Sequence, residues 1–90
     1  MPTPLMMTQH GDSVTVINNT GSTVLLTDMY SEDQPDVLLD TGLGREAQEL
    51  LPGESFAASL ARTIGYADFH ITIEWIDGDE DRGSRTQRFT

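Results

Sequence analysis

The feature that most constrains this chain is a run of alternating apolar and polar residues near its end, at positions 69–76. Every second position holds a large apolar side chain: Phe69, Ile71, Ile73 and Trp75. Because successive side chains of a strand point to opposite faces, this spacing puts all four on one face of a β-strand. The acidic stretch at 77–81 and a second alternating run at 85–90 then predict a β-hairpin.

The chain has ninety residues and no Cys, so we expect one small domain that lacks disulfides and thiolate metal ligands. Several short strand-like runs are separated by turn signals, which fits a sandwich or barrel better than alternating strands and helices. The sequence therefore predicts an all-β, antiparallel fold with about six or seven strands.

The first two strands are predicted at residues 13–18 and 24–30, and their spacing around a turn cluster suggests antiparallel neighbours. Residues 37–39 fit a short third strand. Residues 45–51 are good helix formers, but the run is short and ends at Pro52-Gly53. We favour a loop leading into a strand there, with one helical turn as the alternative.

Pro52-Gly53 suits a type II turn, in which Pro fixes φ and Gly supplies the positive φ. Phe56, Ala58 and Leu60 then alternate with smaller residues as a further strand. At the other end of the chain, Pro2 and Pro4 favour an extended backbone over residues 1–10. That segment is interpreted as an arm that lays an apolar triplet on a neighbouring molecule, with a frayed terminus as the alternative.

Fifteen acidic residues against five basic ones give a formal net charge of −10. This balance argues against binding to nucleic acid or to anionic membranes, which need clustered positive charge, and it favours a basic partner. No apolar run approaches the roughly 20 residues of a membrane span. The first eight residues lack the basic region of a signal peptide, so we expect a soluble chain without a secretion signal.

The acidic stretch at 77–81 has carboxylates close enough in sequence to suggest a calcium loop. An EF-hand would need Gly at the sixth position and Glu at the twelfth, where this chain has Arg82 and Arg88. We therefore favour a solvated hairpin tip, with a different kind of cation site as the alternative.

The remaining candidate chemistry is sparse. Neither His10 nor His70 has an identifiable nucleophile or orienting group. Asn18-Asn19-Thr20 matches a glycosylation acceptor but is also typical of a turn. We predict no catalytic residue, no metal site and no cofactor, and hence a protein that is not an enzyme.

Three of the five arginines lie in the last nine residues, which contain no acid. Pairing with the acidic tip would contribute only about 0–1 kcal/mol. The alternative is a surface that recognises a neighbouring chain, on an edge strand that another chain could extend. These arginines and the apolar triplet make up the predicted partner interface: Leu5, Met6, Met7, Arg82, Arg85 and Arg88.

Three segments carry a family resemblance: a strand with an Asn-Thr-Gly turn (14–22), a Leu-Pro-Gly-Glu-Ser turn (51–55), and a late strand with an acidic exit (71–77). Together they resemble immunoglobulin-like β-sandwich modules of phage virions and bacterial surface proteins. The resemblance implies a small immunoglobulin-like antiparallel β-sandwich over residues 11–90, after an extended N-terminal arm at 1–10. It also implies adhesion, decoration or assembly without catalysis, and it transfers no functional residues.

On this basis we expect a structural or assembly protein, specifically a minor or decoration component of a tailed-phage or related viral capsid. Its partner would be the major capsid protein, another virion protein or further copies of itself. It would reside in the virion, or in the cytoplasm if it is not viral. The alternatives are a carbohydrate- or receptor-binding module using Tyr30, Tyr66 or Trp75, and an acidic nucleic-acid mimic that inhibits a basic host protein in a salt-sensitive way.

Overall fold

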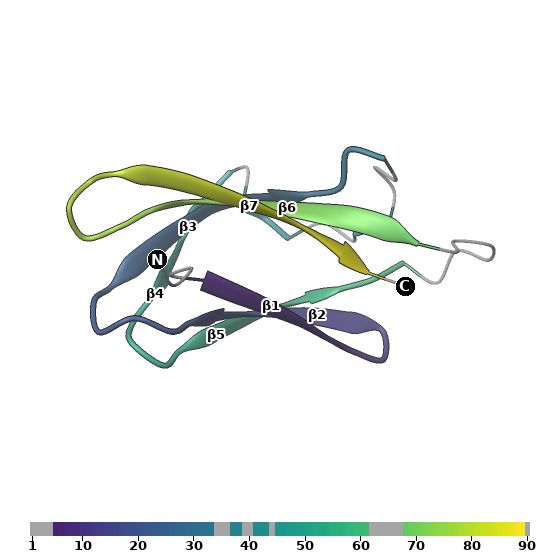
Figure 1. The fold of residues 1–90 in the computed structure, drawn as a ribbon, viewed down its shortest axis with the longest axis horizontal. Helices are drawn as coiled ribbons and strands as arrows, with labels where there is room; N and C mark the ends of the chain where they lie inside the picture. Colours follow the sequence, from purple (N-terminus) through teal and green to yellow (C-terminus); the bar gives the residue numbers. More distant parts are fainter. Residues whose placement is uncertain (1–4, 34–36, 39–40, 44, 62–67, 90) are drawn as a thin grey trace.

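The computed structural model describes residues 5–33, 37–38, 41–43, 45–61 and 68–89. These residues form seven strands and no helix, in two antiparallel sheets that pack face to face (Figure 1). In chain order the strands are β1 (Leu5–His10), β2 (Ser13–Asn18), β3 (Val24–Tyr30), β4 (Gln48–Leu50), β5 (Ser55–Ser59), β6 (Phe69–Ile76) and β7 (Arg82–Phe89). The predicted all-β sandwich is therefore confirmed.

One sheet has the order β1-β2-β5 and the other has the order β4-β3-β6-β7. In the seven-stranded constant-type immunoglobulin order, the fourth strand extends the sheet of the first, second and fifth strands. Here β4 pairs with β3 instead and enlarges the opposite sheet to four strands.

Among the described residues, no helix is long and apolar enough to cross a membrane.

The alternating run that predicted the last hairpin forms β6, and its apolar face lies in the core. All four predicted residues are buried: Phe69, Ile71, Ile73 and Trp75. The hairpin is confirmed by a continuous register from Phe69 opposite Phe89 to Ile76 opposite Arg82. The rings of Phe69 and Phe89 stack with centroids 5.9 Å apart. The opposite sheet contributes Val14 and Val16 to the same core.

The prediction that the strands at 13–18 and 24–30 are antiparallel neighbours is wrong. β2 pairs with β1 and β5, whereas β3 pairs with β4 and β6. The connection between them crosses from one sheet to the other, and the buried Asn18 side chain lies at its start. Its Nδ2 donates to the carbonyls of Ser22 and Leu50, both at 2.8 Å. Its Oδ1 accepts from the backbone N–H and the hydroxyl of Thr20.

Asn18 is the acceptor position of the possible glycosylation motif, and it is fully buried. Its side chain joins the crossover to β4, so the interpretation of this segment as turn chemistry is confirmed. The turn at Pro52-Gly53 is also confirmed. Gly53 has a φ of 81°, and the N–H of Glu54 donates to the carbonyl of Leu51 at 2.9 Å, as a type II turn requires.

Two predicted boundaries need correction. The arm expected at 1–10 is, from Leu5 to His10, a strand of the sandwich, because pairing with β2 buries alternate side chains. Residues 37–38 make only an isolated bridge, between Leu38 and Leu60. The preferred interpretation of 45–51 is confirmed, since a turn leads into β4. The sequence-based predictions also include Pro2, Pro4, Leu39, Tyr66 and Thr90, which lie outside the described residues.

The first and last strands lie beside each other on one side of the sandwich, although they belong to different sheets. The Gln87 side chain on β7 donates through Nε2 to the Met7 carbonyl on β1 at 3.2 Å. The two strands run in the same direction, so the start of β1 and the end of β7 lie toward opposite ends of the molecule (Figure 1).

Candidate functional site

Charge is divided unequally between the two sheets. The strands of the three-stranded sheet contain no Asp, Glu, Lys or Arg. The strands of the four-stranded sheet contain six charged residues: Asp28, Glu49, Glu74, Arg82, Arg85 and Arg88. In a chain with fifteen acidic residues, a whole sheet without a charged side chain is the clearest chemical asymmetry of the fold.

The outer surface of the three-stranded sheet, called the neutral face here, is a grid of three rows. Its outward positions are Met6, Thr8, His10, Ser13, Thr15, Ile17, Ser55, Ala57 and Ser59. Thr15 lies at the centre, between Thr8 and Ala57. The intervening side chains lie on the side of the sheet that faces the core, although Gln9 at the end of β1 is exposed. Hydroxyl, methyl and thioether groups dominate this surface.

Carboxylates border the neutral face at its two ends but do not enter it. Asp12 lies in the turn between β1 and β2, and Glu54 lies in the turn before β5. The Glu54 carboxylate accepts the Leu51 N–H at 2.8 Å. Two large hydrophobic side chains are exposed in the described part of the chain: Met6 at 44% and Leu51 at 47%. Met6 belongs to the neutral face, and Leu51 lies in the turn that leads to β5.

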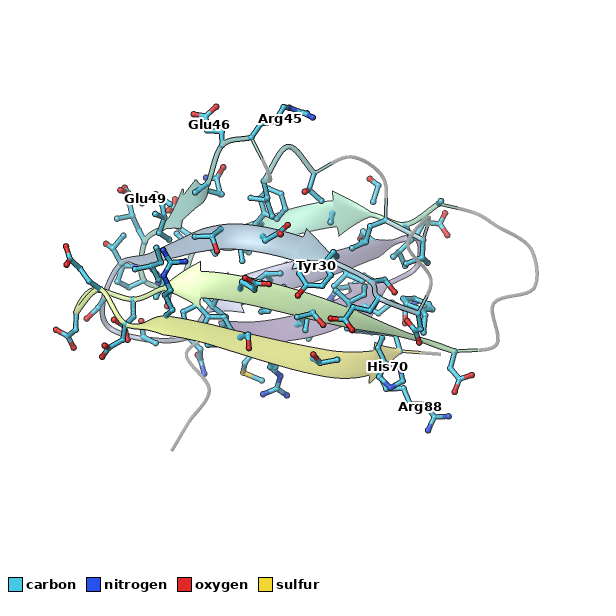
Figure 2. All side chains as sticks on the ribbon, turned by 90° about the horizontal axis from the view of Figure 1, so that it is seen from above. Tyr30, Arg45, Glu46, Glu49, His70 and Arg88 are labelled. Carbon is cyan, nitrogen blue, oxygen red and sulfur yellow. The ribbon has the colours of Figure 1, made fainter. Side chains whose placement is uncertain are left out.

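The outer surface of the four-stranded sheet, called the charged face here, carries many polar side chains (Figure 2), and several of them are paired within the chain. Its outward positions are Leu25, Asp28, Tyr30, Glu49, His70, Thr72, Glu74, Ile76, Arg82, Ser84, Thr86 and Arg88. The hydroxyls of Thr72 and Thr86 hydrogen-bond across the strands at 2.8 Å. Arg88 forms an ion pair with Asp68 at 2.6 Å. Polar groups already paired in this way have less to offer a partner.

Tyr30 and Glu74 form the clearest pair at the middle of the charged face. The Tyr30 hydroxyl donates to Oε2 of Glu74 at 2.8 Å. This hydrogen bond to a carboxylate, helped by desolvation and by neighbouring acids, raises the pKa of Tyr30 to about 12. Tyr30 is therefore held as a neutral hydrogen-bond donor, and its hydroxyl is engaged within the chain.

Asp33 holds the start of β6 through two contacts with His70. One carboxylate oxygen accepts the His70 backbone N–H at 3.0 Å, and the other lies 2.9 Å from the ring Nδ1. These hydrogen bonds, the side-chain one first, hold the pKa of Asp33 well below its usual range. Ser31 also donates to this carboxylate at 2.9 Å.

A histidine oriented by a carboxylate can serve as a general base if a nucleophile is presented to it. Thr72 and Thr86 line the same depression of about 200 Å³ as His70. Their hydroxyls hydrogen-bond to each other. The contacts of Asp33 with His70, called the Asp33–His70 clasp here, join the segment that follows β3 to the start of β6.

The acidic stretch at 77–81 is the exposed tip of the β6–β7 hairpin, and Asp77 organises it. Its Oδ1 accepts the backbone N–H groups of Asp79 and Asp81, at 2.9 and 3.0 Å. Glu80 has a positive φ of 64°. Three or more His, Asp or Glu residues placed to hold a metal ion do not occur in the part of the chain that the structure describes.

The six residues of the predicted partner interface do not form one patch. Leu5 and Met7 are buried in the chain's own core, because β1 is part of the sandwich. Met6 is exposed on the neutral face. Arg82 and Arg88 lie on the charged face, whereas Arg85 is half-buried on the other side of β7. The interface prediction therefore needs correction for Leu5 and Met7.

The neutral face was not predicted from the sequence, although the sequence contains the pattern that produces it. The absence of charge from residues 5–10, 13–18 and 55–59 is visible in the sequence. It acquires meaning only when these segments are known to share one sheet.

Comparisons with protein-family models, with curated proteins and with solved structures find no match for this chain.

Proposed function

We propose that this chain is a non-enzymatic structural or assembly protein that packs against protein subunits through its neutral face. The observation that carries the proposal is the confinement of charge to the other sheet and to the turns. Charged residues are depleted from the buried centres of protein interfaces, where they would lose their hydration. A sheet face whose strands contain no Asp, Glu, Lys or Arg, bordered by Asp12 and Glu54, has this arrangement of neutral centre and charged rim.

We further propose that the assembly is the virion of a tailed phage or a related virus, with this chain as a minor or decoration component of the capsid. The resemblance of residues 14–22, 51–55 and 71–77 to virion sandwich modules supports this setting. The partner would be the major capsid protein, another virion protein or a further copy of the chain. Association with large particles suits a small face, because many weak contacts add up on a repeated lattice.

An aromatic platform for carbohydrate is less well supported. Trp75 is only 6% exposed, and the Tyr30 hydroxyl is engaged with Glu74. Sugar recognition commonly needs an exposed ring, whereas the Trp75 ring is buried and Tyr30 is half-buried. A structural role needs only the neutral surface that the sandwich already presents.

The proposal is tested by density-gradient sedimentation of particles from a host that produces this chain, followed by detection with an antibody against it. We expect the chain in the particle fraction. Ala57→Glu, which puts a carboxylate on the neutral face, should shift the chain to the top of the gradient. Gln48→Glu adds the same charge on exposed β4 and should leave the particle fraction unchanged. A wild-type chain found only at the top of the gradient would contradict the proposal.

A further inference from the structure

We propose that the occupant of the neutral face is a second copy of this chain, an inference that rests on the proposed use of this face in assembly. Two identical neutral faces would meet across a two-fold axis. In such an isologous contact the same patch is used by both partners. Thr15, at the centre of each grid, would then lie opposite its counterpart.

The charge of the chain determines which face two copies can bring together. Each copy carries −10, so two copies repel one another in solution. Contacts through the charged face or the hairpin tip would bring carboxylates together, including Glu49, Glu74 and Asp79. Contact through the neutral face buries no carboxylate and no guanidinium group, which avoids the desolvation penalty of burying one. The carboxylates nearest to it remain at the rim, in contact with water.

A basic partner fits this face poorly. Such a protein would be attracted to the acidic turns, where Asp77, Asp79, Glu80 and Asp81 cluster. The neutral face has no carboxylate to attract a basic protein, and burying Lys or Arg side chains there would cost free energy. An uncharged surface is complementary to another uncharged surface, and the chain itself carries one.

The shape of the face also suits sheet-on-sheet contact. Two sheets stack about 10 Å apart when their facing side chains are compact. Ser55, Ala57 and Ser59 occupy all the outward positions of β5, and they permit such an approach. At the end of the grid formed by Met6, Ile17 and Ser55, the exposed Met6 provides an adaptable apolar contact.

The dimensions predict a weak, reversible dimer. Three strands of five or six residues, at about 3.3 Å per residue and about 4.8 Å between strands, cover on the order of 300 Å² in plan. That area is below the usual size of a stable interface, which buries roughly 800 Å² per partner. Self-association should therefore depend on concentration and increase where copies are held close together.

Analytical ultracentrifugation of the purified chain, over a range of concentrations and salt, tests the inference. We expect a monomer–dimer equilibrium that strengthens as salt rises, because screening reduces the repulsion between two −10 chains. A contact driven by opposite charges would weaken with salt, and that result would overturn the inference. So would a chain that remains monomeric up to about 1 mM, the range where association is negligible.

Two variants locate the contact. Ala57→Glu and Thr15→Glu each place two carboxylates in a symmetric interface and should weaken the dimer at least about tenfold. Gln48→Glu is the matched control on the other sheet and should leave the dimer unchanged. Thermal unfolding of each variant shows whether it is folded at the temperature of the measurement. A dimer that survives both substitutions in folded protein places the contact elsewhere and overturns the inference.

The two experiments distinguish a failure of this inference from a failure of the proposed function. A monomeric chain that still sediments with particles would refute the second-copy inference and leave the assembly role intact. A dimer that never enters the particle fraction would refute the virion role and leave the inference intact.

Discussion

The indole ring of Trp75 lies directly over the backbone of Gly83, its register partner on β7. A Cβ atom added at Gly83 would lie 2.5 Å from Cε2 of the indole and 2.6 Å from its Nε1. Real Cβ atoms do not approach other heavy atoms so closely. Glycine therefore occupies this strand position because the only Trp of the chain fills the space that a side chain would need.

We expect Gly83→Ala to lower the free energy of unfolding by about 1–3 kcal/mol, the usual cost of overpacking a core. Denaturant unfolding followed by Trp fluorescence measures it directly. Gly21→Ala is the control, because nothing lies within 4 Å of a Cβ atom there; its effect should stay within about 0.5 kcal/mol. Equal stabilities for the two variants would mean that the indole does not cover Gly83 in solution.

Asn18→Ala should be more damaging than expected for an Asn in a polar turn sequence, because Asn18 is buried. The substitution removes hydrogen bonds to Ser22 and Leu50 and leaves a buried carbonyl without its partner. We expect a loss of about 2–3 kcal/mol, within the range for such unsatisfied groups. Asn19→Ala, at the neighbouring exposed position, should have little effect. Thermal unfolding of both variants checks the difference, and similar melting temperatures would refute the buried crossover.

The Asp33–His70 clasp should make stability depend on acidic pH. The pKa of Asp33 is lowered in the folded state, chiefly by hydrogen bonds from His70. Its stabilisation is therefore complete above the unfolded pKa of about 3.9, and it is lost as the pH falls toward the lower folded pKa. Asp33→Asn lacks this contribution at every pH.

The stability difference between wild type and Asp33→Asn should thus shrink as the pH is lowered from about 4. Urea unfolding at a series of pH values measures it. Glu32→Gln changes the adjacent exposed carboxylate and provides the control. A difference that grows in acid would show that the carboxylate is not held in its charged form by this contact.

The phenol of Tyr30 should ionise only in strong alkali. Its pKa is raised to about 12 because its hydroxyl donates to the Glu74 carboxylate. Ultraviolet titration in a Tyr66→Phe background isolates the Tyr30 phenolate. Glu74→Gln removes the negative charge and should bring the pKa back toward its ordinary value near 10. An unchanged titration in Glu74→Gln would exclude this pair in solution.

The sequence predicts elements whose signal is local. The alternation of Ile71, Ile73 and Trp75 with polar residues suffices for β6, because a strand's two faces follow directly from the period of its side chains. Pro52-Gly53 likewise specifies its turn through two backbone dihedral preferences. Neither inference needs to know what the rest of the chain does.

The partners of each strand are not a local property. A short turn after β2 is compatible with a hairpin and also with a crossover to the other sheet. The choice depends on Asn18 reaching the Leu50 carbonyl, thirty-two residues away. The neutral face depends on the same choice, because β5 joins β2 only after the crossover is known. The buried positions of Leu5 and Met7 likewise follow from the pairing of β1 with β2.

The placement of β1 and β7 has a mechanical consequence. Because these strands run in the same direction, with the start of β1 and the end of β7 toward opposite ends of the molecule (Figure 1), tension between Leu5 and Phe89 acts along their axes. The hydrogen bonds to β2 and β6 lie across that direction. They are loaded together in shear rather than opened one after another, and the Gln87–Met7 bond ties the two stressed strands to each other. A pull on Leu5 and Phe89 would therefore have to break many of these hydrogen bonds at once, and the resistance to it would be governed by the rate of unfolding under force.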